Sequence, residues 1–239
     1  MKAQLILENG TRFTGEMFGD CKNIVGEIVF TTNMTGYQET LTDPSYCGQI
    51  VVMTFPLIGN YGINLDDGEA EHTNLKGFVV REKCEFPSNF RNEMNLDDYL
   101  KDEGVVGFEG IDTRALTRII RDYGCMKAVI MQGEPSDEEV KALMDTLDNS
   151  DVIMQCTTKE KYILNQGGKP KVAFIDMGAK SGILRDLKER GCEITVFPAN
   201  VSAEEIEGYD PDLVFLSNGP GDPLDAPGTV DTVKALIGK

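Results

Sequence analysis

The sequence predicts two domains of different class, an α+β domain over residues 1–155 and, after a linker over 156–170, the first part of an α/β domain over 171–239. Three observations support this division. Strand patterns dominate the first half of the chain, a polar and glycine-rich stretch follows, and strands alternate with helices after Lys171. A chain of 239 residues has room for two domains of ordinary size.

Apolar stretches separated by turn residues predict the strands of the first domain. Gln4–Leu7 and Arg12–Thr14 flank Asn9-Gly10, a dipeptide typical of tight β-hairpin turns. The other strands are expected at residues 24–31, 49–54, 77–81, 105–108 and 126–131.

Two helices are expected late in this domain. Asp112 can cap a helix that runs through Arg121 and is closed by Gly124, and the apolar residues of this helix fall on one face. Ser136 and Glu139 form a capping box for a second helix that ends near residue 147. Strands followed by helices predict the α+β class.

In the second domain, strands and helices alternate. Strands are expected at 171–176, 193–197 and 212–216, and helices at 181–190, after Ser202, and at 229–237. This order predicts right-handed βαβ units and a doubly wound, flavodoxin-like parallel sheet. Because such sheets usually have about five strands or more, we expect this domain to be cut short.

Composition limits the classes of partner and cofactor. The net charge of −17 disfavours nucleic acid and anionic membranes as partners. No apolar stretch is long enough to cross a bilayer, and the first residues do not read as a signal peptide, so we expect a cytoplasmic protein. The six cysteines form no C-x-x-C pair and His72 is the one histidine, so we expect reduced thiols and no metal site.

The stretch with the most specific indication of function is the loop Ser217-Asn-Gly-Pro-Gly-Asp-Pro223, which follows a strand that we expect to be buried. Because glycine has no Cβ, the backbone N–H groups of Gly219 and Gly221 can approach a ligand closely. Such a loop at the carboxyl end of a parallel strand can hold an oxyanion or a carboxylate, although it can also be a simple turn. Neither G-x-G-x-x-G nor a P-loop is present, which argues against nucleotide binding.

A second candidate is the long run of hydroxyl and amide side chains at residues 31–49, between two apolar strands. A polar loop of this length inside a domain is usually functional. Ser45 follows Pro44, which restricts the backbone, although Ser45 taken alone is more typical of a turn. Cys47 lies in the same run, but no Cys-His or Ser-His-Asp arrangement can be assembled around it. The sequence therefore supplies binding groups without a reactive centre.

Four stretches match one known family. They are residues 26–46, Ile58-Gly-Asn-Tyr-Gly62, Gly110-Ile-Asp-Thr-Arg-Ala-Leu-Thr117 and Ser217–Pro223. Through them the whole chain resembles the small, glutamine-hydrolysing subunit of carbamoyl-phosphate synthase, covering that family's N-terminal domain and the first part of its class I glutamine amidotransferase domain. The last stretch fits many class I amidotransferases, whereas the first and third separate this family from its relatives.

The resemblance implies that a cysteine thiolate attacks the γ-amide of L-glutamine, that ammonia leaves, and that hydrolysis of the thioester gives glutamate. The ammonia would pass to a large subunit, which uses ATP and Mg to make carbamoyl phosphate from bicarbonate for arginine and pyrimidine synthesis. By motif match, Gly219 would donate its N–H to the tetrahedral oxyanion and Gly221 would help to hold glutamine. Ser45 would reach the substrate from the N-terminal domain.

The chain departs from the family in its reactive residues. The family's nucleophile lies in Gly-x-Cys-x-Gly, and none of the six cysteines has that context, so no catalytic residue is expected here. Met177 and Gly182 stand where the family usually has an aromatic residue and an asparagine. We therefore expect this polypeptide alone to lack glutaminase activity, and its N-terminal domain to fold independently. The alternative is a non-catalytic docking and binding module for the large subunit.

Overall fold

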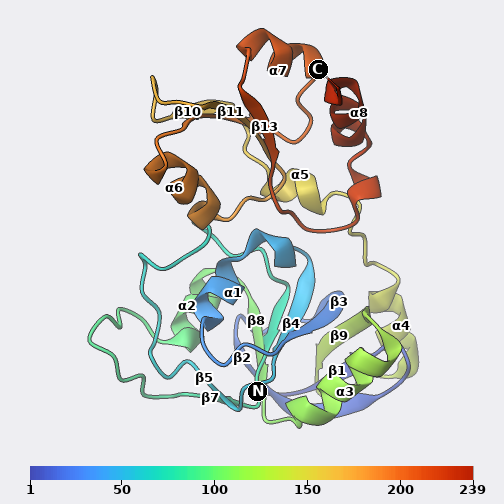
Figure 1. Ribbon diagram of the computed structural model, residues 1–239. Helices are drawn as coiled ribbons and strands as arrows, with labels where there is room; N and C mark the ends of the chain where they lie inside the picture. Colours follow the sequence, from blue (N-terminus) through green and yellow to red (C-terminus); the bar gives the residue numbers. More distant parts are fainter. Residues whose placement is uncertain (239) are drawn as a thin grey trace. The chain divides into compact units, whose positions relative to one another are not determined.

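The computed structural model describes residues 1–238, which separate into two compact units, one from Met1 to Asp148 and one that begins at Asn149 (Figure 1). The stretch expected as a linker belongs to the second unit. It contains strand β10 (Tyr162–Leu164), which pairs antiparallel with β12 (Glu193–Pro198). Helix α5 (Val152–Cys156) precedes it and buries Val152 and Ile153.

Seven strands of the first unit match the seven predicted from the sequence. They are β1 (Lys2–Leu7), β2 (Arg12–Gly19), β3 (Ile24–Thr31), β4 (Gln49–Met53), β6 (Gly77–Val79), β8 (Val106–Glu109) and β9 (Met126–Gln132). They close into a barrel in the order β1-β2-β8-β6-β4-β3-β9, which the sequence analysis does not predict. The pairs β3-β4, β4-β6 and β6-β8 are parallel, and the other four pairs are antiparallel.

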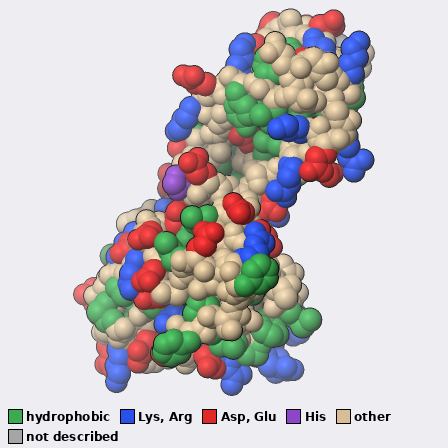
Figure 2. Space-filling view, turned by 90° about the vertical axis from the view of Figure 1, so that its left-hand side faces the viewer, with side chains coloured by type: hydrophobic (Ala, Val, Ile, Leu, Met, Phe, Trp, Pro, Cys, Tyr) green, Lys and Arg blue, Asp and Glu red, His purple; other side chains and the backbone are tan. Residues whose placement is uncertain are grey.

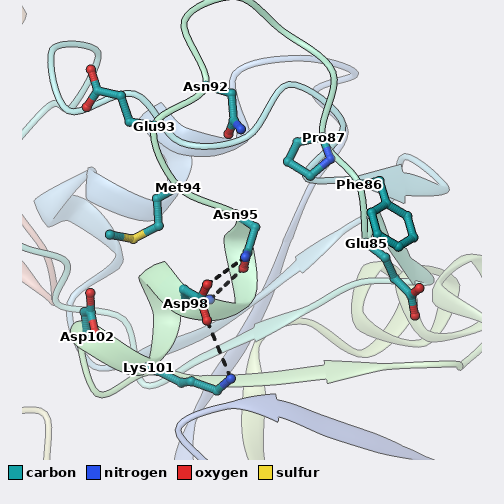
Figure 3. A pocket seen from close by; sticks show the side chains of 10 residues that line it. All are labelled: Glu85, Phe86, Pro87, Asn92, Glu93, Met94, Asn95, Asp98, Lys101 and Asp102. Atoms are coloured by element: carbon teal, nitrogen blue, oxygen red, sulfur yellow. Dashed lines mark hydrogen bonds and ion pairs between the residues drawn. The ribbon is translucent and has the colours of Figure 1, made fainter.

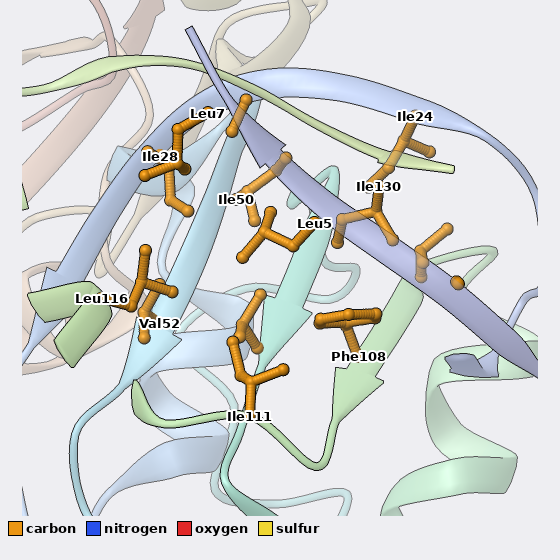
Figure 4. Close-up of a cluster of buried hydrophobic side chains, with 14 of the residues drawn as sticks. Leu5, Leu7, Ile24, Ile28, Ile50, Val52, Phe108, Ile111, Leu116 and Ile130 are labelled. Atoms are coloured by element: carbon orange, nitrogen blue, oxygen red, sulfur yellow. The ribbon is translucent and has the colours of Figure 1, made fainter. Parts of the chain in front are cut away.

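The interior of the barrel is an apolar core. Each of the seven strands contributes at least one buried side chain to it, and Figure 4 shows Leu5, Ile28, Ile50, Phe108 and Ile130 meeting there. The alternation of inward and outward side chains along each strand gives this arrangement.

Helices α3 (Thr113–Tyr123) and α4 (Asp137–Met144) begin where the sequence predicts. The Asp112 carboxylate accepts a hydrogen bond from the Ala115 N–H at 3.0 Å. Ser136 and Glu139 form both halves of the capping box, because each side chain accepts a hydrogen bond from the other's backbone N–H. Gly124 ends α3 with φ at +88°.

Five short elements of the first unit are absent from the sequence prediction. They are helices α1 (Tyr37–Thr42) and α2 (Leu96–Asp102), the 3₁₀ turn η1 (Pro44–Tyr46), and strands β5 (Leu57–Ile58) and β7 (Glu82–Lys83). Apolar residues of α1 and α2 share a second buried cluster with outward-facing residues of the barrel, among them Val51, Met53 and Phe78.

The second unit is a four-stranded sheet in the order β10-β12-β11-β13, one strand more than predicted. Strands β11 (Lys171–Asp176) and β13 (Leu213–Leu216) are parallel to each other, and β11 is parallel to β12. Apolar residues of helix α6 (Ser181–Glu189) pack against one hydrophobic cluster of this sheet. Residues of α7 (Ala203–Tyr209) and α8 (Pro227–Leu236) pack in a different cluster, so helices cover two faces.

Acidic and basic side chains are interspersed on the face shown in Figure 2.

All six cysteines are reduced thiols; Cys47 and Cys192 are buried, and Cys21 and Cys125 are exposed. Among residues 1–238, no helix combines the length and the apolar character needed to cross a membrane.

Candidate functional site

The loop that follows β13 is fixed at its first residue. Ser217 is buried and its N–H donates to the Ile175 carbonyl at 3.1 Å. Its Oγ accepts a hydrogen bond from the Met177 N–H at 2.8 Å and donates one to the Asn218 carbonyl at 2.6 Å. The loop is thereby tied to the end of β11, the neighbouring strand.

Asn218 makes a second link between the two strand ends. Its Nδ2 donates to the Gly178 carbonyl at 3.0 Å, and its Oδ1 accepts from the Lys180 N–H at 3.3 Å. These bonds hold the loop to the neighbouring strand end, and an oxyanion site requires donors that are held in this way.

The carboxylate of Asp176, at the end of β11, serves the backbone. It is buried, and its Oδ1 accepts from the Gly178 and Ala179 N–H groups at 3.0 and 2.8 Å. Its Oδ2 accepts from the Thr158 N–H at 2.7 Å. With these three backbone donors, the Asp176 carboxylate fixes the turn that follows β11 and ties it to Thr158.

The two glycines of the loop are required by close contacts. A Cβ on Gly219 would lie 2.3 Å from the carbonyl oxygen of Met177. Gly221 has φ at +76°, and a Cβ there would lie 2.8 Å from Cγ2 of Val152. Both glycines are exposed, and within residues 1–238 neither of their N–H groups donates a hydrogen bond. Two backbone donors at the end of a parallel strand therefore remain available to a ligand.

A pocket of about 370 Å³ adjoins this loop, within the range of small-molecule sites. Gly219 and Gly221 line it together with Thr229, Val230 and Lys234 of α8. Apart from the Lys234 amino group the side chains of its lining are uncharged, so the pocket suits a small ligand with an apolar stem and a polar or anionic end.

Ser45 lies in the first unit, in the turn η1, whereas Gly219 and Gly221 lie in the second. The Ser45 N–H donates to Oδ1 of Asp43 at 3.0 Å, and Pro44 occupies the first position of the turn. The structure thus fixes the backbone at Ser45, as expected for a residue that follows a proline.

The polar run around Ser45 is not a long loop, and in this respect the sequence interpretation was wrong. It folds into α1 and η1, and many of its polar side chains are buried. The side-chain amide of Gln38 makes two hydrogen bonds with the backbone of Asn64. Its Oε1 accepts from the Asn64 N–H at 2.9 Å, and its Nε2 donates to the Asn64 carbonyl. Thr42 Oγ1 accepts from the Glu69 N–H at 2.8 Å. These amide and hydroxyl groups hold α1 in place.

A pair of tyrosines completes the support of α1. The rings of Tyr37 and Tyr61 are stacked with centroids 4.1 Å apart. The Tyr61 hydroxyl accepts hydrogen bonds from the Gly36 and Tyr37 N–H groups, both at 3.1 Å, and the Tyr37 hydroxyl donates to the Gly62 carbonyl at 2.5 Å. Burial raises the pKa of both phenols, and the Glu39 carboxylate raises that of Tyr61 further. Because Gly36 has no side chain to cap α1, Tyr61 does so from elsewhere in the chain.

Neither His72 nor Cys125 has the surroundings of an activated nucleophile. His72 is largely exposed and its Nδ1 lies 3.4 Å from Oε1 of Glu103. Partial desolvation raises the pKa of the Cys125 thiol, although much of the residue is exposed, and the nearby Glu27 carboxylate raises it further, the opposite of what a reactive thiolate needs.

The two glycines can be recognised in the sequence, whereas the residues that position the loop and helix α1 cannot. Asn218 stands inside the motif, but its links to Gly178 and Lys180 span 40 and 38 residues and leave no local signal. Tyr61 lies in a stretch that matches the family, but the stretch does not reveal that its hydroxyl caps α1.

Residues 5–130 match the family model of the carbamoyl-phosphate synthase small chain, CPSase domain, and residues 173–239 match that of glutamine amidotransferase class-I. Small chains of carbamoyl phosphate synthase from Clostridium perfringens and Bacillus caldolyticus are 54% and 50% identical to all of this chain. The pyrimidine-specific small chain of Bacillus subtilis is 47% identical over 243 residues.

These matches take in 100% of this chain but 68%, 66% and 66% of the three relatives, so the chain spans about two thirds of their length. The family model of the small chain covers more than half of the sequence, and the relatives match it from end to end. The chain therefore belongs to the family of carbamoyl-phosphate synthase small chains.

Proposed function

We propose that this chain contributes to the glutamine-hydrolysing small subunit of a carbamoyl-phosphate synthase. In this function the amide nitrogen of L-glutamine leaves as ammonia and passes to a large subunit. The large subunit uses ATP and Mg to make carbamoyl phosphate from bicarbonate. Membership of the small-chain family supports this proposal.

The observation that carries the proposal is the loop of Gly219 and Gly221, with two exposed N–H groups beside a pocket of about 370 Å³. In the proposed reaction the Gly219 N–H donates to the oxyanion of the tetrahedral intermediate, and Gly221 helps to hold glutamine. A fixed donor of this kind is worth roughly 3–4 kcal/mol of barrier in comparable acyl-transfer sites. Ser45 contributes a hydroxyl contact to the same substrate, from a turn that α1 and Asp43 hold in place.

The nucleophile is a cysteine thiolate, which forms a thioester with the glutamine side chain and is regenerated by water. None of the six cysteines of these 239 residues lies in a Gly-x-Cys-x-Gly sequence. We therefore expect this polypeptide to bind glutamine without hydrolysing it. A non-catalytic docking module for the large subunit is the second candidate, favoured by the absence of a Gly-x-Cys-x-Gly sequence from these 239 residues.

The finer parts of the proposal follow from the family. Helices on two faces of a largely parallel sheet support a flavodoxin-like, doubly wound amidotransferase domain. Reduced thiols suit the cytoplasm, where we place the reaction, and its product would serve pyrimidine and arginine synthesis.

The test is to titrate this polypeptide with L-glutamine, with D-glutamine as the control ligand, and to assay glutamate release with and without a large chain. We expect saturable binding of the L isomer, weakened in Ser45→Ala, and no glutamate. Steady glutamate release that is lost on substitution of Cys47 would contradict the mechanism. Absence of any binding of L-glutamine would contradict the role of the loop.

A further inference from the structure

Two phenylalanines of the first unit are almost fully exposed. Phe86 and Phe90 show 85% and 96% of their surface to solvent. The other nine phenylalanines of the chain are buried or half-buried. Burying an aromatic side chain stabilises a protein, so two phenylalanines left exposed within five residues need an explanation.

The segment that carries them is firmly held. Its backbone is anchored by hydrogen bonds from Cys84 N–H to the Ile58 carbonyl (2.8 Å) and from Ser88 N–H to the Asn60 carbonyl (3.0 Å). The guanidinium of Arg91 also donates two hydrogen bonds to the carboxylate of Asp67, a bidentate ion pair with both N–O distances at 3.0 Å.

Its far end is anchored as well, since Ile63 N–H donates to the Met94 carbonyl at 2.8 Å and Glu93 N–H to the Ile63 carbonyl at 3.0 Å. A surface that is already ordered loses little entropy when a partner binds, which favours a docking role.

Between this segment and helix α2 lies a broad hollow of about 690 Å³ (Figure 3). Four carboxylates line it, Glu85 and Glu93 from the segment and Asp98 and Asp102 from α2. The cation of the lining, Lys101, is already engaged, with its Nζ 2.6 Å from Asp97 and 3.8 Å from Asp98. The hollow therefore has a strongly negative rim next to exposed aromatic rings.

These features select one class of occupant. The carboxylates repel nucleic acid and anionic lipid. A small molecule is poorly served by rings that project into solvent, whereas aromatic side chains beside charged groups are characteristic of protein interfaces. The occupant that fits is a protein surface with apolar cavities surrounded by lysine and arginine.

We propose that residues 85–102, which we term the Phe86 surface, dock a partner protein of this chemistry. This inference rests on the proposed function, under which the partner is the large chain of the synthase. Phe86 and Phe90 supply the buried anchors, and the carboxylates orient the approaching basic surface.

The experiment measures binding of the purified chain to the large chain encoded with it, by surface-immobilised kinetics at two salt concentrations. The double variant Phe86→Ala/Phe90→Ala should raise Kd at least about 30-fold, because aromatic anchors dominate such interfaces. The variant Glu85→Gln/Asp102→Asn should mainly slow association and reduce its dependence on salt. Tyr123→Ala removes an exposed aromatic ring from α3 of the same unit and should leave Kd unchanged.

The outcomes separate the two proposals. If the wild-type chain does not bind the large chain, the proposed function fails and the docking inference fails with it. If the wild-type chain binds and the phenylalanine variant binds equally well, the Phe86 surface is not the interface, while the proposed function stands. If sedimentation shows that the phenylalanines instead hold two copies of this chain together, the occupant is a second copy and the inference is overturned. Circular dichroism confirms that each variant is folded, as expected for exposed positions.

Discussion

The substitution Tyr61→Phe tests the account of why α1 stays in place ahead of Ser45. It removes one oxygen atom and keeps the ring that stacks on Tyr37 at 4.1 Å. The lost oxygen accepts hydrogen bonds from the Gly36 and Tyr37 N–H groups, both at 3.1 Å. Because Gly36 offers no cap of its own, these two donors lose their partner.

The expected cost follows from the two bonds. Removal of a helix N-cap costs about 0.5–2 kcal/mol, and a buried donor left without a partner costs about 1–3 kcal/mol. Gly36 is half-buried, so water can satisfy one donor in part. We therefore expect the free energy of unfolding of the first unit to fall by about 1–2 kcal/mol.

The assay is urea unfolding followed by circular dichroism, together with hydrogen exchange at the Gly36 and Tyr37 amides. Tyr123→Phe is the matched control, since that ring is 74% exposed at the end of α3. If both substitutions change the free energy of unfolding by the same small amount, and exchange at the two amides is not accelerated, Tyr61 does not cap α1.

Two further predictions concern other parts of the chain. Gly219→Ala places a Cβ 2.3 Å from the carbonyl oxygen of Met177, so we expect the free energy of unfolding of the second unit to fall by about 1–3 kcal/mol. The urea concentration at the midpoint of unfolding should fall accordingly, and an unchanged midpoint would show that the loop can move to avoid the contact. Burial alone would raise the pKa of Asp97, but hydrogen bonds from Lys101 Nζ and the Gly19 N–H outweigh it and lower the pKa. A lowered pKa contributes stability above the ordinary pKa of about 3.8 that is lost as the pH falls through the folded-state value. Asp97→Asn should therefore lower the free energy of unfolding by about 1 kcal/mol at pH 7 and make it depend less on pH below pH 4. The same dependence on pH as in the wild type would refute the assignment.

Local signals in the sequence were sufficient for the barrel strands and for helices α3 and α4, but not for α1 and α2. Strand β3 spans residues 24–31 as expected, and α3 and α4 begin at the predicted caps. The closure of the barrel was not predictable, because side-chain alternation shows which face is buried and not which strand lies alongside. The sheet of the second unit was predicted one strand short, because residues 162–164 lie between polar stretches that read as a linker.

The candidate site was predictable in part for a similar reason. Gly219 and Gly221 can be identified from their residue type, whereas the roles of Gln38 and Asn218 depend on partners 26 and 40 residues away. Gln38 was read as one of many polar loop residues because polarity alone does not distinguish a solvent-facing amide from one that holds a buried backbone. The role of Ser45 in glutamine binding stays a prediction.

The barrel and the four-stranded sheet differ in how they end. The barrel leaves none of its seven strands as an edge. Among residues 1–238, strand β13 pairs with β11 alone, and Leu213, Val214 and Leu216 on it are exposed. An apolar strand with one open side is a template onto which another strand can add, whether from the same chain or from a neighbouring molecule. Within the described residues β13 is therefore, like β10, an open edge, and a charged residue placed at Val214 would oppose the addition of a strand there.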